Sequence, residues 1–121
     1  MTTQEVAFRY YELACQNKWN EIQETLHDES IISREPENRA PAGIETITRG
    51  KVAVKVKTDT HRAMIETMHS RHTSEPLVAG NFFTTVLKRD VTYKGRPRAI
   101  SEEIAVIEVK NGKIVSETFF Y

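Results

Sequence analysis

The first residues of the chain repeat apolar positions with a helical period. Thr2 is followed three residues later by Glu5, a spacing typical of the capping box that closes a helix N-terminus. The pattern predicts a helix over about Thr3–Gln16. Its apolar face consists of Val6, Tyr10, Leu13 and Ala14, widened by Phe8, Tyr11 and Cys15.

A second amphipathic helix is predicted after a break at Asn17-Lys18, where Trp19, Ile22 and Leu26 recur at helical spacing. The two helices would form a helical hairpin. A third helix is favoured from Gly50 to about Ala63, because a polar run follows a short segment whose valines fit either helix or strand.

The remaining segments have the alternation and β-branched composition of strands. A hairpin is predicted from Ser30–Ser33 and Ile44–Thr48, with residues 36–43 as an exposed loop. Four further segments follow, with a bulge expected at Gly80 and a tight turn at Asn111-Gly112. Helices first and long strands last indicate the α+β class. The four segments are Thr67–Ser74, which resembles an edge strand, Leu77–Tyr93, Ala99–Val109 and Lys113–Tyr121.

Composition narrows the classes of function. The 121 residues fit one domain, 1–121, and 39% hydrophobic with 28% charged residues is a globular composition. A formal net charge of zero disfavours nucleic acid as a partner and a polybasic membrane anchor. No apolar run is long enough to span a membrane. The lone Cys15, on an apolar helix face, is expected to be a buried inert thiol and fits the reducing cytoplasm, where we expect the protein.

Strand alternation assigns side chains to faces of the expected sheet. On one strand Glu103, Ala105 and Ile107 share a face with Val109, and we assign this face to the interior. On the last strand one face carries Val115, Glu117, Phe119 and Tyr121. A bulge would invert such assignments.

If these faces are interior, Glu103 and Glu117 lie on neighbouring strands among apolar groups. Lost solvation and mutual repulsion would raise both pKa values toward those useful for acid–base chemistry. Tyr10 and Tyr121 could then donate hydrogen bonds to a developing oxyanion. The alternative interpretation is that both carboxylates point outward or pair with arginine or lysine.

The histidines give a weaker signal. His69 and His72 are three apart on a predicted strand, so they would point to opposite faces and could not chelate one metal ion. We expect no metal site. One of His69 or His72 could face the pocket as an acid–base group, with His69 the candidate for a contact with a ligand. The alternative is an exposed edge-strand histidine, and His61 is expected to be exposed. Trp19 is either a core anchor or part of a ligand-binding surface.

The chain resembles the SnoaL-like branch of the nuclear transport factor 2-like superfamily. The resemblance lies in the order of elements and in short segments spread along the chain. It implies a strongly curved sheet wrapped into a cone around the helices, a cystatin-like α+β barrel, and a homodimer formed through the outer sheet face. It also implies an interior pocket that in some members performs cofactor-free chemistry. The segments are Tyr10–Leu13, Asn17 with Trp19, Gly50-Lys51, Tyr93–Arg96, Glu102–Ile104 and Lys110–Val115.

Similarity to ketosteroid isomerases, members of the same superfamily, covers only part of their catalytic set. Tyr10 matches their oxyanion-holding tyrosine, but Arg34 falls at the position of their general base and Ala105 near that of their second acid. An arginine stays protonated and cannot accept a proton at neutral pH. Steroid isomerisation by that set of residues is therefore disfavoured.

Three functions remain open. The chain could bind a small, largely apolar molecule and act as a cofactor-free isomerase or cyclase, with Glu103 as acid–base and Tyr10 positioning the substrate oxygen. The same pocket, with Ile107, Glu117, Phe119, Tyr121, Trp19 and His69 as its lining, could bind a ligand without catalysis. Alternatively, the domain could serve only for dimerisation, with its interior filled by its own side chains.

Overall fold

Two short helices open the chain, as predicted. The computed structural model describes residues 1–121, beginning with α1 (Thr3–Cys15) and α2 (Trp19–Leu26). The side chain of Thr2 accepts from the backbone N–H of Glu5, and the Glu5 carboxylate accepts in return from Thr2, which confirms the capping box. The expected apolar face of α1 is too wide, however, because Phe8 and Cys15 are exposed. The thiol is therefore not a core group.

The middle of the chain forms a small hairpin and the third helix. The predicted hairpin strands shift in their bounds: β1 (His27–Arg34) is longer than expected, and β2 (Ile47–Arg49) is shorter and begins later. Gly50 precedes α3 (Lys51–Ala63) at φ +92°, a conformation that favours glycine. The third helix is thereby confirmed.

The second half of the chain consists of strands β3 (Ile65–Thr73), β4 (Leu77–Ala79), β5 (Phe82–Tyr93), β6 (Ala99–Lys110) and β7 (Lys113–Phe120). The prediction of one strand from Leu77 to Tyr93 is wrong. Gly80 does not form a bulge but occupies a tight turn at φ +59°, which folds β4 back onto β5. At the other predicted turn, Asn111 and Gly112 both have positive φ and join β6 to β7.

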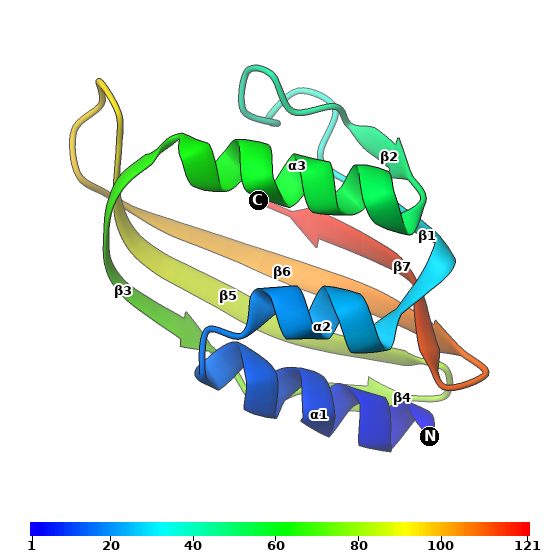
Figure 1. Ribbon diagram of the computed structural model, residues 1–121. Coiled ribbons are helices and arrows are strands. Elements are labelled where there is room, and N and C mark those ends of the chain that lie inside the picture. The colour runs from blue at the N-terminus through cyan, green and yellow to red at the C-terminus, as the bar shows by residue number, and fades with distance from the viewer.

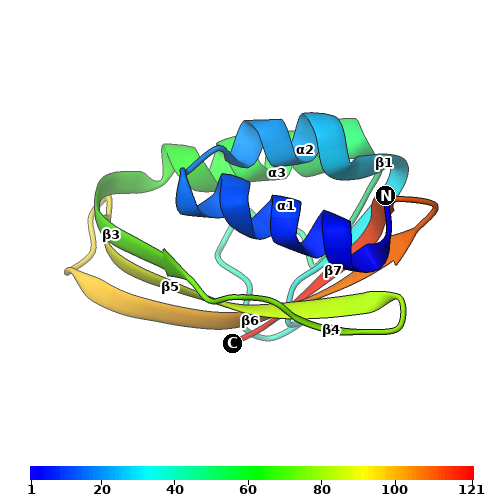
Figure 2. The same cartoon turned by 90° about the horizontal axis from the view of Figure 1, so that it is seen from below.

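The seven strands form one curved, unclosed sheet in the order β2-β1-β7-β6-β5-β3, with β4 attached to β5. All neighbours are antiparallel except β1 and β7, which are parallel. The three helices lie on one face of this sheet, as Figure 1 and the perpendicular view in Figure 2 show. The α+β class and the sheet wrapped around helices are confirmed. No helix is long and apolar enough to cross a membrane.

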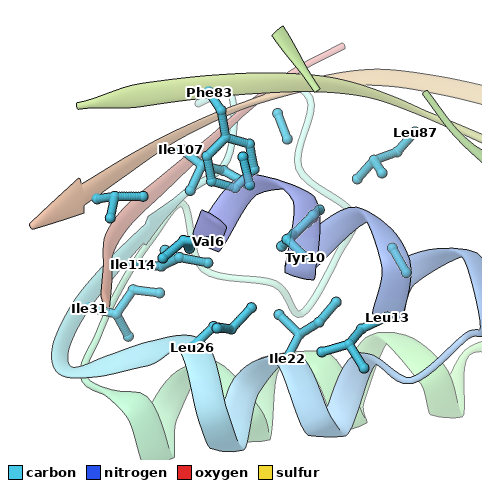
Figure 3. Packing of buried hydrophobic residues seen from close by; sticks show 14 of the residues in the cluster. Val6, Tyr10, Leu13, Ile22, Leu26, Ile31, Phe83, Leu87, Ile107 and Ile114 are labelled. Carbon is cyan, nitrogen blue, oxygen red and sulfur yellow. The ribbon is translucent and has the colours of Figure 1, made fainter. Parts of the chain in front are cut away.

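The hydrophobic core lies between α1, α2 and the concave face of the sheet (Figure 3). Phe83 and Ile107 face each other across β5 and β6, and α1 contributes Val6 and Leu13 from the opposite side. These side chains are nearly inaccessible to water, and burial of such groups drives folding. The core fills the part of the interior that adjoins the β6–β7 turn.

A one-residue bulge in β7 shifts the register against β6. Val109 pairs with Ile114, but Glu108 pairs with Ser116, so Val115 is the extra residue. Ile114 is buried in place of Val115, which corrects the expectation that Val115 faces the interior. Beyond the bulge the predicted alternation holds, and Glu117 faces inward opposite Ile107.

Candidate functional site

A cavity of about 290 Å³ continues the interior beyond the core, toward the ends of β5, β6 and β7 that lie away from the β6–β7 turn. Both hydrophobic and polar groups surround it. Aromatic and aliphatic lining groups include Tyr10, Trp19, Ile22, Leu87, Phe119 and Tyr121. Its ionisable lining groups are Glu35, Glu103, Glu117, Lys57, Arg62, Arg71, Lys88, Arg89, His27, His61, His72, Tyr93 and the tyrosines already named.

Glu103 points into this cavity, as predicted, but it is not free. One carboxylate oxygen accepts a hydrogen bond from the Arg89 guanidinium at 2.9 Å, and both side chains are mostly buried. Burial raises the pKa of Glu103, while Arg89 acts in the opposite direction. Glu103 is thus both an interior carboxylate and a member of an ion pair, the alternative that the sequence left open.

A second ion pair lies at the end of the cavity formed by α3 and the loop after β1. Lys57 lies 3.1 Å from Glu35 and donates a hydrogen bond to Ser33 at 2.6 Å. Its ammonium also lies 5.4 Å from the centre of the Phe119 ring, within range of a cation–π contact. These contacts fix the position of Lys57 above the last strand.

Glu117 is the carboxyl group that lines the cavity without a cation within 4 Å. Burial raises its pKa to about 7, and Glu35 and Glu103 add to the shift, against the opposing effects of Lys57 and Ser33. A carboxyl with this pKa exchanges its proton near neutral pH, which is the property required of a general acid or base.

The two tyrosines singled out in the sequence, Tyr10 and Tyr121, both line the cavity. Tyr10 lines the cavity from α1, and burial, with the carboxylates of Glu117 and Glu103, raises its pKa. It therefore stays protonated and is a potential hydrogen-bond donor. The Tyr121 hydroxyl is also enclosed, and burial and the nearby Glu35 carboxylate raise its pKa.

Trp19 lies at the junction between core and cavity. Its ring packs edge-to-face on Tyr10, with centroids 5.8 Å apart, and the guanidinium of Arg71 lies 5.7 Å from its ring centre. The residue is therefore both a core anchor and part of the cavity wall. The two interpretations that the sequence left open for Trp19 therefore both apply.

Two of the predicted site residues do not line the cavity. Ile107 is fully buried in the core, four residues closer to the β6–β7 turn than Glu103, which lines the cavity. His69 is exposed and its ring contacts the Thr92 hydroxyl at 2.8 Å, because the β3–β5 register shifts between Met68 and Ser70. Both predictions failed because strand alternation alone gives neither the position along a strand at which the cavity begins nor the register between strands. The six other predicted residues, Glu103, Tyr10, Glu117, Tyr121, Phe119 and Trp19, line the cavity.

Several cavity residues escaped the sequence analysis. His61 was expected to be exposed, but its ring contacts the Tyr93 hydroxyl at 2.9 Å, and burial, aided by Arg89, lowers its pKa to about 4. Arg71 and Arg89 were not singled out in the sequence, yet both line the cavity. The only signal in the sequence was that each arginine lies two residues from a buried residue on its own strand, and therefore points to the same face of the sheet.

The side chains are not arranged as a metal centre. No group of three His, Cys, Asp or Glu residues is placed to hold a metal ion. His27, which begins β1, is buried with Nδ1 unpartnered, and burial with the nearby Lys51 lowers its pKa to about 4. It is thus a neutral interior imidazole.

A curved α+β sheet around helices, with a partly polar cavity inside, is the arrangement that the sequence comparison also identifies. The family model of the SnoaL-like domain matches residues 1–121. The chain therefore belongs to the SnoaL-like family, and the resemblance seen in the sequence is confirmed. No curated protein matches the chain.

Solved structures agree with this assignment. A Mesorhizobium loti protein described as a SnoaL-like polyketide cyclase is 31% identical, with a TM-score of 0.91 and full coverage of both chains. An NTF2-like protein of unknown function from Burkholderia pseudomallei is 18% identical, with a TM-score of 0.80 over 100% of this chain and 92% of that one. TerC, crystallised with polyporic acid, is 15% identical, with a TM-score of 0.78 over 98% and 90%. The last two show the shared fold alone.

Proposed function

We propose that the protein binds a small, largely apolar molecule in this cavity and transfers a proton on it without a cofactor, as an isomerase or cyclase does. Glu117 is the acid–base group in this proposal, and Tyr10 positions the substrate oxygen. The sequence suggested Glu103 for the first role. Its hydrogen bond to Arg89 stabilises the charged carboxylate and makes it a poorer proton acceptor than Glu117.

The observation that carries the proposal is the enclosure of the Glu117 carboxyl without an ion-pair partner. It is enclosed beside a cavity, has no cation within 4 Å and has a pKa raised to about 7 by burial. Near neutral pH such a group populates both protonation states, so it can accept a proton from carbon and return it elsewhere on the same molecule. Glu103 keeps a negative charge nearby and thereby favours the protonated form of Glu117.

Tyr10 supports the same chemistry from the opposite wall. Its raised pKa keeps the hydroxyl protonated, and a hydroxyl in a place poor in water can stabilise the oxyanion of an enolate. The aromatic packing of Tyr10 against Trp19 and Phe83 holds its ring in place. A donor held before the reaction begins needs no reorganisation during it.

Deuterium exchange at the α-carbon of 2-tetralone, followed by NMR in heavy water, tests the proposal without knowledge of the natural substrate. We expect the wild-type protein to accelerate exchange and Glu117→Gln to reduce this acceleration about 100-fold, in the range that a general base contributes. Glu108→Gln, on the outer face of β6, is the matched control and should leave exchange unchanged. Exchange that is insensitive to Glu117→Gln would refute its catalytic role.

Ligand binding without catalysis is the second candidate. It is favoured by the pairing of Glu103 with Arg89 and of Lys57 with Glu35, which leaves fewer free reactive groups than a typical active site contains. In that case 2-tetralone binds to the wild-type protein and to Glu117→Gln alike, and exchange stays at the rate of the buffer. Calorimetric binding measured beside the exchange assay separates the two functions.

We also propose that the protein forms a homodimer through the outer face of the sheet. Val86, Ile104 and Phe120 are register partners across β5, β6 and β7, and all three are exposed on the face away from the helices. A contiguous exposed apolar row of this kind is typical of an interaction surface, and a second copy presents a matching row by two-fold symmetry.

Light scattering at micromolar concentration tests the dimer. We expect twice the chain mass of 13.9 kDa for the wild-type protein, and the mass of one chain for Ile104→Lys, because a charge at the centre of the row opposes association. Lys110→Glu, a charge change on the same strand but outside the row, should leave the dimer intact. A wild-type mass near 13.9 kDa would contradict the dimer.

A further inference from the structure

Two arginines face each other in the wall of the cavity. Arg71 on β3 and Arg89 on β5 are direct register partners, and both line the cavity. Like charges directly opposite on neighbouring strands repel each other. A nearby anion is needed to balance the second of these two charges.

The chain supplies a carboxylate to only one of them. Arg89 donates to Glu103 at 2.9 Å, whereas Arg71 has no carboxylate within 4 Å. The other cations of the lining are also paired, Lys57 with Glu35, Arg62 with Asp59 and Lys88 with Glu102. Arg71 is thus the one cation of the cavity lining that lacks an ion-pair partner.

The position of Arg71 suits the binding of a ligand anion. Its guanidinium lies 5.7 Å from the centre of the Trp19 ring, and stacking on a ring leaves the N–H groups at the edge of the guanidinium available. Burial and the charge of Arg89 lower its pKa, but an arginine still stays protonated in a protein. The neighbouring His61 is neutral near pH 7 and accordingly adds no competing charge.

We propose that the ligand is a carboxylate-bearing molecule whose anionic group binds Arg71, while its apolar body packs against Trp19 and Leu87. The inference rests on the proposed function, because it names the class of molecule that the cavity takes. Four of the five cationic side chains in the lining have their own carboxylate, so the charge of Arg71 is the one left to favour an anion over a neutral ligand. A planar carboxylate matches the two parallel donors of a guanidinium, and one unpaired arginine suits a single negative charge.

Matched pairs of probes that differ only in charge test the inference. Adamantane-1-carboxylate and adamantane-1-carboxamide share an apolar body and do not absorb where tryptophan does. Trp19 is the only tryptophan of the chain and lies beside Arg71, so its fluorescence reports occupancy directly. Calorimetry with 2-naphthoate and 2-naphthamide provides a second pair with a flat ring system.

We expect the wild-type protein to bind each carboxylate at least tenfold more tightly than its amide. Arg71→Met should weaken carboxylate binding at least tenfold and change amide binding less than threefold, because methionine keeps the apolar stem beside Trp19. Arg71→Lys should retain part of the preference, since a lysine keeps the charge but loses the fork. Arg98→Met is the matched control and should leave binding unchanged, because this arginine pairs with Asp90 at 2.7 Å and does not line the cavity.

The possible failures are distinguishable. Equal binding of carboxylate and amide by the wild-type protein, or a preference that survives in Arg71→Met, would overturn this inference and leave the proposed cavity function in place. Binding of neither probe pair would remove both. Near-ultraviolet circular dichroism of each variant checks that its fold is intact, and Arg71→Lys serves in place of Arg71→Met if the latter does not fold.

Discussion

The two ends of the interior use the same strands in opposite ways. Toward the β6–β7 turn, inward positions carry Phe83 and Ile107, and the space is filled. Toward the other end, the same faces of β5 and β6 carry Arg89 and Glu103, and a cavity of about 290 Å³ remains. Alternation therefore fixes which way a side chain points, whereas its distance along the strand decides whether it meets the core or the cavity.

The difference also separates stability from function. Apolar burial without voids stabilises a fold, whereas charged groups inside it cost desolvation unless they are paired. The chain keeps such groups at one end, where ion pairs satisfy most of them. Substitutions at the two ends should accordingly have different consequences.

The largest expected effect lies in the core. Phe83→Ala should lower the free energy of unfolding by about 3–5 kcal/mol, because it removes a nearly inaccessible ring that packs on Tyr10. Phe119→Ala should cost less than half as much, because that ring is partly exposed and borders a cavity that already exists. Urea unfolding of both variants measures the difference. Equal losses would mean that the two ends are packed alike.

The next largest effect is a gain in the free energy of unfolding when Glu117, at the cavity end, is replaced by glutamine. In the folded state the pKa of Glu117 is raised by burial to about 7, above the ordinary value of 4.5 for a glutamate in water. The folded protein therefore favours the protonated carboxyl. Its contribution to the free energy of unfolding is complete below about pH 4.5 and is lost as the pH rises through 7. At pH 8 we expect Glu117→Gln to be more stable than the wild-type protein by up to about 3 kcal/mol.

Unfolding curves at pH 4 and pH 8 measure this dependence. The difference between wild type and Glu117→Gln should shrink toward pH 4, where the carboxyl is protonated in both states. Glu108→Gln, on the outer face, provides the comparison. A difference that is the same at both pH values would show that Glu117 is not desolvated.

A smaller effect distinguishes enclosed from exposed ion pairs on the same two strands. Glu103→Gln leaves Arg89 enclosed without its carboxylate, at a cost of about 2 kcal/mol, the size expected for a hydrogen bond to a charged group. Glu102→Gln removes the partner of Lys88 from a pair at the edge of the cavity in which both side chains are more than half exposed, and should cost less than about 1 kcal/mol. Thermal unfolding of both variants gives the comparison. Similar costs would indicate that water reaches the Glu103–Arg89 pair freely.

Local signals allowed much of the fold to be predicted from the sequence. The Thr2–Glu5 capping box, the helical period behind it and the Asn111-Gly112 turn each depend on residues close together in the chain. Gly80 was misread because a tight turn and a bulge have the same local signature, a glycine between apolar runs. Only the pairing of β4 with β5 separates them.

The candidate site was predictable in part, for a related reason. The alternation of side chains along β6 and β7 identified Glu103 and Glu117 as interior groups. Alternation could not identify the cation that pairs with Glu103. This cation, Arg89, lies on another strand, and its distance from Glu103 depends on the register between the two strands. His61 and Arg71 belong to polar runs, and only the packing of α3 and β3 against the rest encloses them.

The bulge at Val115 has a consequence for how this chamber can change over generations. Were the β6–β7 ladder regular from the turn onward, Ile107 would pair with Ser116 instead of Glu117. The hydroxyl groups of Ser116 and Thr118 would then point into the cavity and Glu117 to the exterior, while Glu103 on β6 would keep its place. Gain or loss of a single codon near this point is a route by which related chains can exchange the chemistry of their interior while keeping the same outline.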